Sequence, residues 1–177
     1  MNYHTITYPD QNNGDGLRVV LWLSGCSHHC YNCQNPQTWD VNSGIPFDES
    51  AKEELFRELD KDYISGLTLS GGDPLHEANL DGVLDLVNEI RLSFPNKSIW
   101  IYSGFRWSEI FNDGVYLTKE CAGWKRREII KQCTVMVDGR YIDSQRNPSK
   151  KWAGSDNQRV IDIWKSLEQN KIILHCN

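Results

Sequence analysis

The chain has 177 residues, with 24 acidic and 19 basic side chains that give a formal net charge of −5. This length is enough to bury a hydrophobic core, and an apolar content of 39% is typical of a globular protein. The negative charge disfavours nonspecific binding to nucleic acid or to an anionic membrane surface. With no signal peptide and no long apolar run, we expect a cytoplasmic protein that binds neither.

The chain begins with an irregular segment over residues 1–17, in which a short strand is expected around residues 4–8. The first clear strand is the apolar run at residues 18–23. It leads directly into a loop that contains three of the six cysteines in the chain. Because thiols stay reduced in the cytoplasm, this cysteine content indicates metal or redox chemistry before disulfides.

The three cysteines of this loop are Cys26, Cys30 and Cys33. Three thiols on one short loop can converge on a single inorganic group, and no other cysteine lies nearby. An iron–sulfur cubane with three protein ligands leaves one iron open, and an open position is typical of catalytic metal sites. Two alternatives remain: a closed Cys₃His zinc site that includes His28 or His29, and unrelated thiols, some of them in a disulfide.

Beyond the cysteine loop, apolar residues at helical spacing predict helices at residues 50–60, 80–90, 107–111, 124–131 and 159–167. Short apolar runs predict strands at residues 67–69, 98–102, 134–137 and 172–174. Ser50 and Glu53 fit a capping box at the start of the first of these helices. We find no internal repeat, low-complexity segment or linker, so we expect one domain over residues 1–177.

Strands that alternate with helices predict an α/β fold with right-handed crossovers and parallel strands. Several predicted strands stop at a small polar residue followed by glycine: Ser24-Gly25, Ser70-Gly71, Ser103-Gly104 and Asp138-Gly139. Ligands bind at the carboxyl ends of parallel strands, so we expect these turns and the cysteine loop to line one rim. Each glycine taken alone also fits an ordinary turn.

The cysteines and a second motif, Gly71-Gly72-Asp73-Pro74, together resemble the radical S-adenosylmethionine (SAM) enzymes. The cysteine spacing resembles the cluster loop of that superfamily, with aromatic Tyr31 after the second cysteine. The second motif resembles its "GGE" motif, with aspartate in place of glutamate. In its short length and its run from Gly154 to Arg159, the chain more closely resembles one family within that superfamily. This family is the activating proteins of anaerobic ribonucleoside-triphosphate reductase. The resemblance spans most of the chain and implies a partial (βα) barrel with parallel strands.

The resemblance implies a definite chemistry. Cys26, Cys30 and Cys33 would hold three irons of a [4Fe-4S] cluster, and the amino and carboxylate groups of SAM would chelate the fourth. An electron from a low-potential donor such as reduced flavodoxin would cleave SAM to methionine and a 5′-deoxyadenosyl radical. That radical would take a hydrogen atom from a glycine of the large subunit of the reductase and leave a glycyl radical there. No catalytic side chain is expected beyond the cluster and SAM.

The residues that the resemblance assigns to the cofactor are Tyr31, Asn32, Gly71, Gly72, Asp73, Ser103 and Asp138. Asp73 carries the charge to pair with the SAM ammonium group, and the glycines before it allow close backbone approach. The same four-residue motif taken alone fits an ordinary turn. Asp138 lies where related enzymes contact SAM or a bound cation, and a turn-forming aspartate explains it equally well.

Other polar residues are left outside the predicted site. His28 and His29 lie in the cysteine loop, where a histidine more often faces solvent. Cys121, Cys133 and Cys176 are interpreted as structural thiols, because cysteine packs as a small hydrophobic residue.

Two classes of function are therefore open. The first is a radical SAM activase, as the resemblance implies. The second is a zinc-stabilised module that binds a partner protein without catalysis, in which the same thiols form a closed site.

Overall fold

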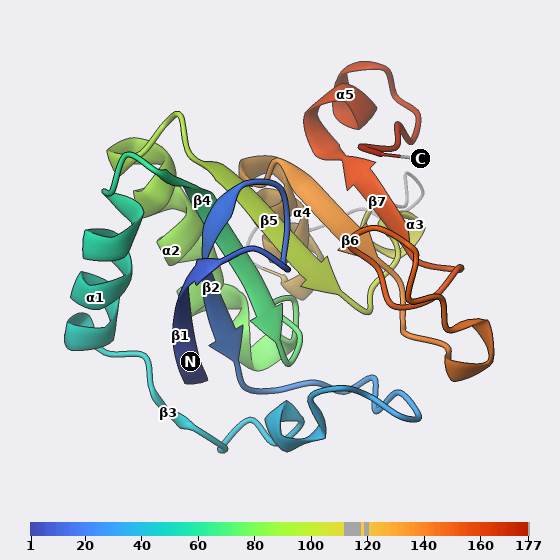
Figure 1. Ribbon diagram of the computed structural model, residues 1–177, viewed down its shortest axis with the longest axis horizontal. Helices are drawn as coiled ribbons and strands as arrows, with labels where there is room; N and C mark the ends of the chain where they lie inside the picture. Colours follow the sequence, from blue (N-terminus) through green and yellow to red (C-terminus); the bar gives the residue numbers. More distant parts are fainter. Residues whose placement is uncertain (112–117, 119–120, 177) are drawn as a thin grey trace.

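The computed structural model describes residues 1–111, 118 and 121–176 (Figure 1). Within these residues, seven strands form one sheet in the order β3-β1-β2-β4-β5-β6-β7. The strands are β1 (Asn2–Asp10), β2 (Leu17–Leu23), β3 (Ile45–Pro46), β4 (Ile64–Gly71), β5 (Ser98–Ser103), β6 (Val135–Asp138) and β7 (Arg159–Asp162). Strands β2, β4, β5 and β6 are parallel, whereas β1, β3 and β7 run antiparallel to their neighbours. The predicted α/β class is confirmed, and the sheet is mixed with a parallel centre.

The α-helices among the described residues are α1 (Glu49–Leu59), α2 (Leu80–Ser93), α3 (Trp107–Ile110), α4 (Ala122–Gln132) and α5 (Ile163–Glu168). In Figure 1, α2 and α4 lie behind the sheet and α1 lies to its left, and loops cover the front face. The main core forms between these helices and the sheet, where Leu55, Val87 and Ile130 pack with strand residues such as Leu21 and Leu69. Helix α2 buries one apolar stripe in it, as its spacing predicts.

Strand β5 is buried on both of its faces. Ile99 and Ile101 belong to the main core, whereas Trp100 belongs to a second cluster on the opposite face, with Val137 of β6 and Trp152 packed against it. A strand that is covered on both faces has a continuous run of apolar residues, and the sequence of β5 has such a run. The second cluster holds the segment after β6 against the front of the sheet.

Arg18 crosses the far end of the sheet and is 0% exposed. Its guanidinium group donates to Thr68 Oγ1 (2.6 Å) and Leu67 O (2.5 Å) of the neighbouring strand β4 and to Ser98 Oγ (2.9 Å) of β5, the next strand along. Burial lowers the pKa of Arg18 to about 10. Three parallel strands are thus joined by one side chain at the end opposite the cysteine loop.

Three sequence predictions need correction. Helix α1 is capped by Asp48, whose side chain accepts a hydrogen bond from Ala51 N–H, so the predicted capping box of Ser50 and Glu53 is wrong. The helix predicted at residues 159–167 begins instead as strand β7, because its β-branched residues pair with β6, and only α5 is helical. Residues 172–174 form an isolated bridge to β7 rather than a strand.

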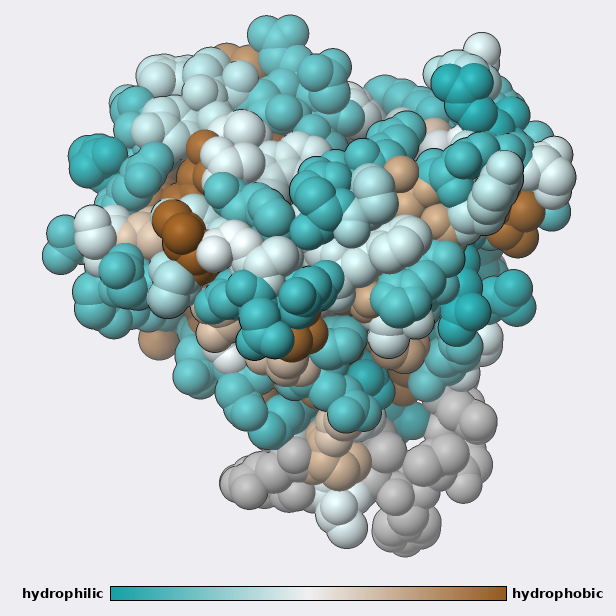
Figure 2. All heavy atoms as spheres, turned by 90° about the horizontal axis from the view of Figure 1, so that it is seen from below, coloured by the Kyte–Doolittle hydropathy of each residue, from teal (hydrophilic) through white to brown (hydrophobic). Residues whose placement is uncertain are grey.

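The carboxyl ends of the parallel strands lie at one edge, as predicted. Leu23 pairs with Gly71, and Ser103 pairs with Asp138, so the turns that follow these residues are neighbours. This edge is the lower side of Figure 1 and is seen from below in Figure 2, where apolar residues form separate patches within a hydrophilic surface. Among the described residues, no helix has the length and hydrophobicity needed to cross a membrane.

Candidate functional site

The cysteine loop leaves β2 and is closed at its base by backbone hydrogen bonds. Gly25 N–H donates to Thr38 O (2.7 Å) and Cys26 N–H donates to Trp39 O (3.0 Å). His29 and Asn32 adopt left-handed backbone conformations, with φ of 46° and 54°, which fold the loop back on itself. All three thiols are free and partly exposed, and they line one pocket of about 130 Å³.

Backbone N–H groups surround the sulfur atoms. Asn35 N–H donates to Cys33 Sγ at 3.4 Å. Burial raises the pKa of Cys26 to about 11, although backbone hydrogen bonds from His28 and His29 oppose the shift. Burial also raises the pKa of Cys30. Without a metal the Cys26 and Cys30 thiols are therefore protonated at neutral pH, and a metal that binds them must displace their protons.

A buried donor beside the thiols fits a group rich in sulfur. Trp39 lines the same pocket, and its Nε1 is the one buried side-chain nitrogen or oxygen without a hydrogen-bond partner in the described part of the chain. Among those residues, no three His, Cys, Asp or Glu side chains are grouped closely enough to hold a single metal ion. Three thiols around a cavity, with N–H donors at their sulfurs, are the donor set of an iron–sulfur cluster.

The turn after β4 is hydrogen-bonded directly to the start of the cysteine loop. Gly72 N–H donates to Leu23 O and Asp73 N–H donates to Gly25 O, both at 2.7 Å. Gly71 has φ +97°, and a Cβ atom there would lie 2.7 Å from the backbone of Leu23. Glycine is therefore required at this position by both conformation and space.

The Asp73 carboxylate is only 2% exposed and accepts several hydrogen bonds. Its donors are His28 Nε2–H (2.7 Å), Leu75 N–H (2.8 Å), Ser103 Oγ–H (2.9 Å) and Gly104 N–H (2.9 Å). The side chain thus joins the cysteine loop to the turns that follow β4 and β5.

The sequence pattern does not mark His28 as a site residue. Its side chain is 5% exposed, so the expectation that it faces solvent is wrong, whereas His29 is exposed as expected. No apolar periodicity marks a buried residue in this loop. The only available signal is the presence of an imidazole between two predicted ligands.

The predicted site residues divide into two groups. Those that line the pocket are Cys26, Cys30, Cys33, Gly71, Gly72, Asp73 and Ser103. Those outside its lining are Tyr31, Asn32 and Asp138. Tyr31 is 77% exposed. Asp138 is 1% exposed and accepts hydrogen bonds from Arg159 Nε–H (3.0 Å) and Trp107 N–H (2.8 Å).

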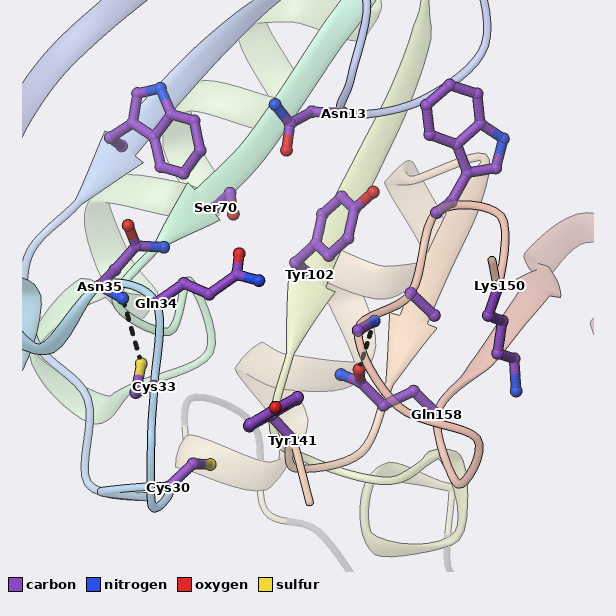
Figure 3. Close-up of a pocket in the computed structure, with 14 residues that line it drawn as sticks. Asn13, Cys30, Cys33, Gln34, Asn35, Ser70, Tyr102, Tyr141, Lys150 and Gln158 are labelled. Atoms are coloured by element: carbon purple, nitrogen blue, oxygen red, sulfur yellow. Dashed lines mark hydrogen bonds between the residues drawn. The ribbon is translucent and has the colours of Figure 1, made fainter. Parts of the chain in front are cut away.

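A larger cavity of about 320 Å³ adjoins this pocket on the helix-free face of the sheet. The residues common to both linings are Cys30, Cys33, Ser70, Tyr102, Tyr141 and Gln158. Figure 3 shows Cys30 and Cys33 on one side of this cavity and Gln158 on the other, with Tyr102 of β5 between them. Burial raises the pKa of Tyr102, so its hydroxyl stays neutral. Tyr141 and Gln158 were not predicted as site residues.

Comparisons with known proteins agree with this donor set. A family model described as a 4Fe-4S single cluster domain matches residues 12–161. The chain is 39% identical over 170 residues to the anaerobic ribonucleoside-triphosphate reductase-activating protein of Enterobacteria phage T4, with 93% of this chain and 99% of the relative covered. Proteins of the same name from Escherichia coli K12 and Vibrio cholerae are 37% and 36% identical, with 90% of this chain and 97% of each relative covered.

Proposed function

Because the chain belongs to the family of anaerobic ribonucleoside-triphosphate reductase-activating proteins, we propose that Cys26, Cys30 and Cys33 hold the [4Fe-4S] cluster with which it activates that reductase. It is a radical SAM enzyme, and the zinc-stabilised module is set aside because the relatives and the family model fit an activase. The bound cluster and SAM supply one-electron cleavage of SAM and hydrogen abstraction that leaves a glycyl radical on the reductase.

The observation that carries this assignment is the shared pocket, in which the three thiols and the Gly71–Asp73 turn line the same cavity. Three cysteines leave one iron open for SAM. The backbone N–H groups of His28, His29 and Asn35 lie at cysteine sulfurs, where they stabilise thiolate charge. The protein's role at the cluster is thus placement and electrostatics, and no catalytic side chain is proposed.

For the SAM head group we propose the turn after β4 and the adjoining Ser103. Asp73 supplies negative charge toward the ammonium group, and carbonyls of Gly71 and Gly72 accept its remaining protons. The support is that these residues line the pocket together with the thiols. Tyr31, Asn32 and Asp138 stay predicted cofactor contacts with less support, because they lie outside that lining.

The finer architecture is also a proposal. We propose one radical SAM domain over residues 1–177, with the four parallel strands as the wall of a partial (βα) barrel. The arrangement of helices on one face and a 320 Å³ cavity on the other supports this description. The cavity would then lie inside the barrel, next to the cluster ligands.

The partners follow from the chemistry. We propose that a glycine-bearing segment of the large subunit of the reductase is the substrate and that a low-potential donor such as reduced flavodoxin supplies the electron. A cytoplasmic location is supported by the six cysteines, all of which are free thiols.

Anaerobic reconstitution tests the assignment. We expect brown protein with about four irons per chain, an EPR signal that changes when SAM is added, and a glycyl doublet once the reductase is present. Replacing any of the three loop cysteines with alanine should abolish SAM cleavage. Colourless protein with one zinc, or undiminished cleavage in a cysteine variant, would contradict the ligand assignment.

A further inference from the structure

His28 reaches from the middle of the cysteine loop into the turn after β4. It stands between Cys26 and Cys30, and its Nε2–H donates to Asp73 Oδ2 at 2.7 Å. Both side chains are almost fully buried, with 5% and 2% exposed. A charge-assisted hydrogen bond at this distance and burial fixes the relative position of the two groups.

The imidazole ring is also seated on the turn after β5. The Phe105 ring packs edge-to-face against it with centroids 4.8 Å apart. A Cβ atom added at Gly104 would lie 2.2 Å from the ring, so glycine is what makes room for His28 here. Gly104 N–H donates to the same Asp73 oxygen, Oδ2, at 2.9 Å. Three segments, from β2, β4 and β5, thus meet at one carboxylate.

The proposed site has two halves that lie on different segments. The thiols are on the cysteine loop, whose base is held by the backbone bonds of Gly25 and Cys26. The proposed SAM head-group contacts are on the turns after β4 and β5. The hydrogen bond between His28 and Asp73 joins these halves at the middle of the loop, next to the ligands rather than at its base.

We propose that His28 is a positioning residue for SAM, which holds the Asp73 carboxylate and the cysteine loop in the register that lets one head group reach both. This inference rests on the proposed function. Residues that orient a ligand from one layer behind it contribute about 10- to 100-fold to affinity or activity. Loss of the N–H donor from His28 should therefore weaken SAM binding about tenfold or more, with iron content unchanged.

Two variants separate the hydrogen bond from ring packing. His28→Gln keeps an N–H donor at a similar reach but removes the ring. His28→Phe keeps a ring against Phe105 and Gly104 but leaves Asp73 without this donor. A matched control is Ser27→Ala in the same loop, because the Ser27 side chain is exposed and lies outside the pocket lining.

The experiment measures three quantities for wild type, the two variants and the control. These are iron per chain, the melting temperature of the iron-free protein, and SAM affinity from titration of the EPR change. We expect His28→Phe to keep its iron and lose affinity about tenfold or more, His28→Gln to recover most of it, and Ser27→Ala to match wild type.

Wild-type affinity in His28→Phe would overturn the proposal, and so would loss of iron from both variants, since His28 would then be part of the loop scaffold. Failure of the proposed function looks different, because wild-type protein would then hold iron yet show no EPR response to SAM.

Discussion

Arg18 shows what a single buried polar residue contributes to this protein. Its guanidinium group satisfies oxygen acceptors of Leu67, Thr68 and Ser98 inside the sheet. Arg18→Ala should lower the free energy of unfolding by about 3 kcal/mol, because the acceptors lose their donor and a cavity forms. Urea denaturation measures this loss. Arg146→Ala, at an exposed side chain outside the sheet, is the control and should change stability by less than about 0.5 kcal/mol. A loss below about 1 kcal/mol for Arg18→Ala would show that water replaces the lost donor.

Cys133 offers a prediction that depends on pH. It is 0% exposed, and burial raises the pKa of its thiol from 9.0 to about 12. The folded state therefore keeps the proton that the unfolded state releases, so this contribution to stability is complete below pH 9 and is lost as pH rises toward 12. At pH 8 we expect iodoacetamide to label Cys133 far more slowly than the partly exposed Cys176. Peptide mapping by mass spectrometry measures both rates, and equal labelling of the folded protein would contradict the burial of Cys133.

The site residues that could be predicted lie close together in the sequence, in motifs whose spacing indicates their chemistry. The three loop cysteines and the Gly71–Asp73 turn are recognisable because each motif is contiguous. His28 is different, because its partner Asp73 is 45 residues away and its burial comes from turns after two other strands. The same holds for Asp138, whose partner Arg159 lies 21 residues along the chain. Such pairings arise only when the strands assemble.

At the scale of elements, the start of α1 depends on one cap. Asp48 Oδ1 accepts a hydrogen bond from Ala51 N–H at 3.0 Å, at the first turn of the helix. Asp48→Ala should lower stability by about 1 kcal/mol. Ser50→Ala is the matched control and should be neutral or slightly stabilising, because residue 50 lies inside the helix and alanine has the highest helix propensity. Urea denaturation of the two variants decides which residue caps the helix. A larger loss of stability for Ser50→Ala than for Asp48→Ala would support the capping box instead.

Element type was predictable where the apolar pattern was long or fully buried. Helix α2 and strands β2 and β5 follow directly from their runs of apolar residues. Strand β7 was not predictable, because Val160 and Ile161 are followed at once by the capped helix α5, and the combined stretch imitates one helix. Pairing with β6 makes residues 159–162 a strand, and this pairing is a tertiary contact that local sequence does not encode.

At the scale of the whole molecule, the main core is independent of the cysteine loop. None of residues 24–44, all of which the structure describes, belongs to that core. Removal of iron with a chelator should therefore leave far-UV circular dichroism and the urea midpoint nearly unchanged, while protease cleavage within residues 26–44 increases. Circular dichroism and mass spectrometry of the fragments test this. Cooperative loss of helix signal on chelation would show that the cluster supports the fold.

The parallel centre of the sheet was predictable from alternating strands and helices, because crossover connections require it. The antiparallel direction of the outer strands was not, although the strand expected around residues 4–8 lies within β1. Strand β1 comes from a segment rich in turn residues, and β7 follows a polar stretch without a crossover helix. Their direction is decided by which edge of the assembled sheet each segment reaches.

The strands at the two edges of the sheet, β3 and β7, affect how a partner polypeptide can be bound. Strand β3 is only two residues long and includes Pro46, which has no N–H to donate. On the opposite edge, Asp162 N–H donates to Ile173 O (2.9 Å) and His175 N–H donates to Val160 O (2.8 Å), so the outer side of β7 is already occupied. These two strands thus offer little free backbone to an added strand, whereas β1 beyond Tyr3 pairs with no outer strand among the described residues. A polypeptide that extends this sheet would therefore pair with β1, and one bound elsewhere would be held through side chains and surface shape.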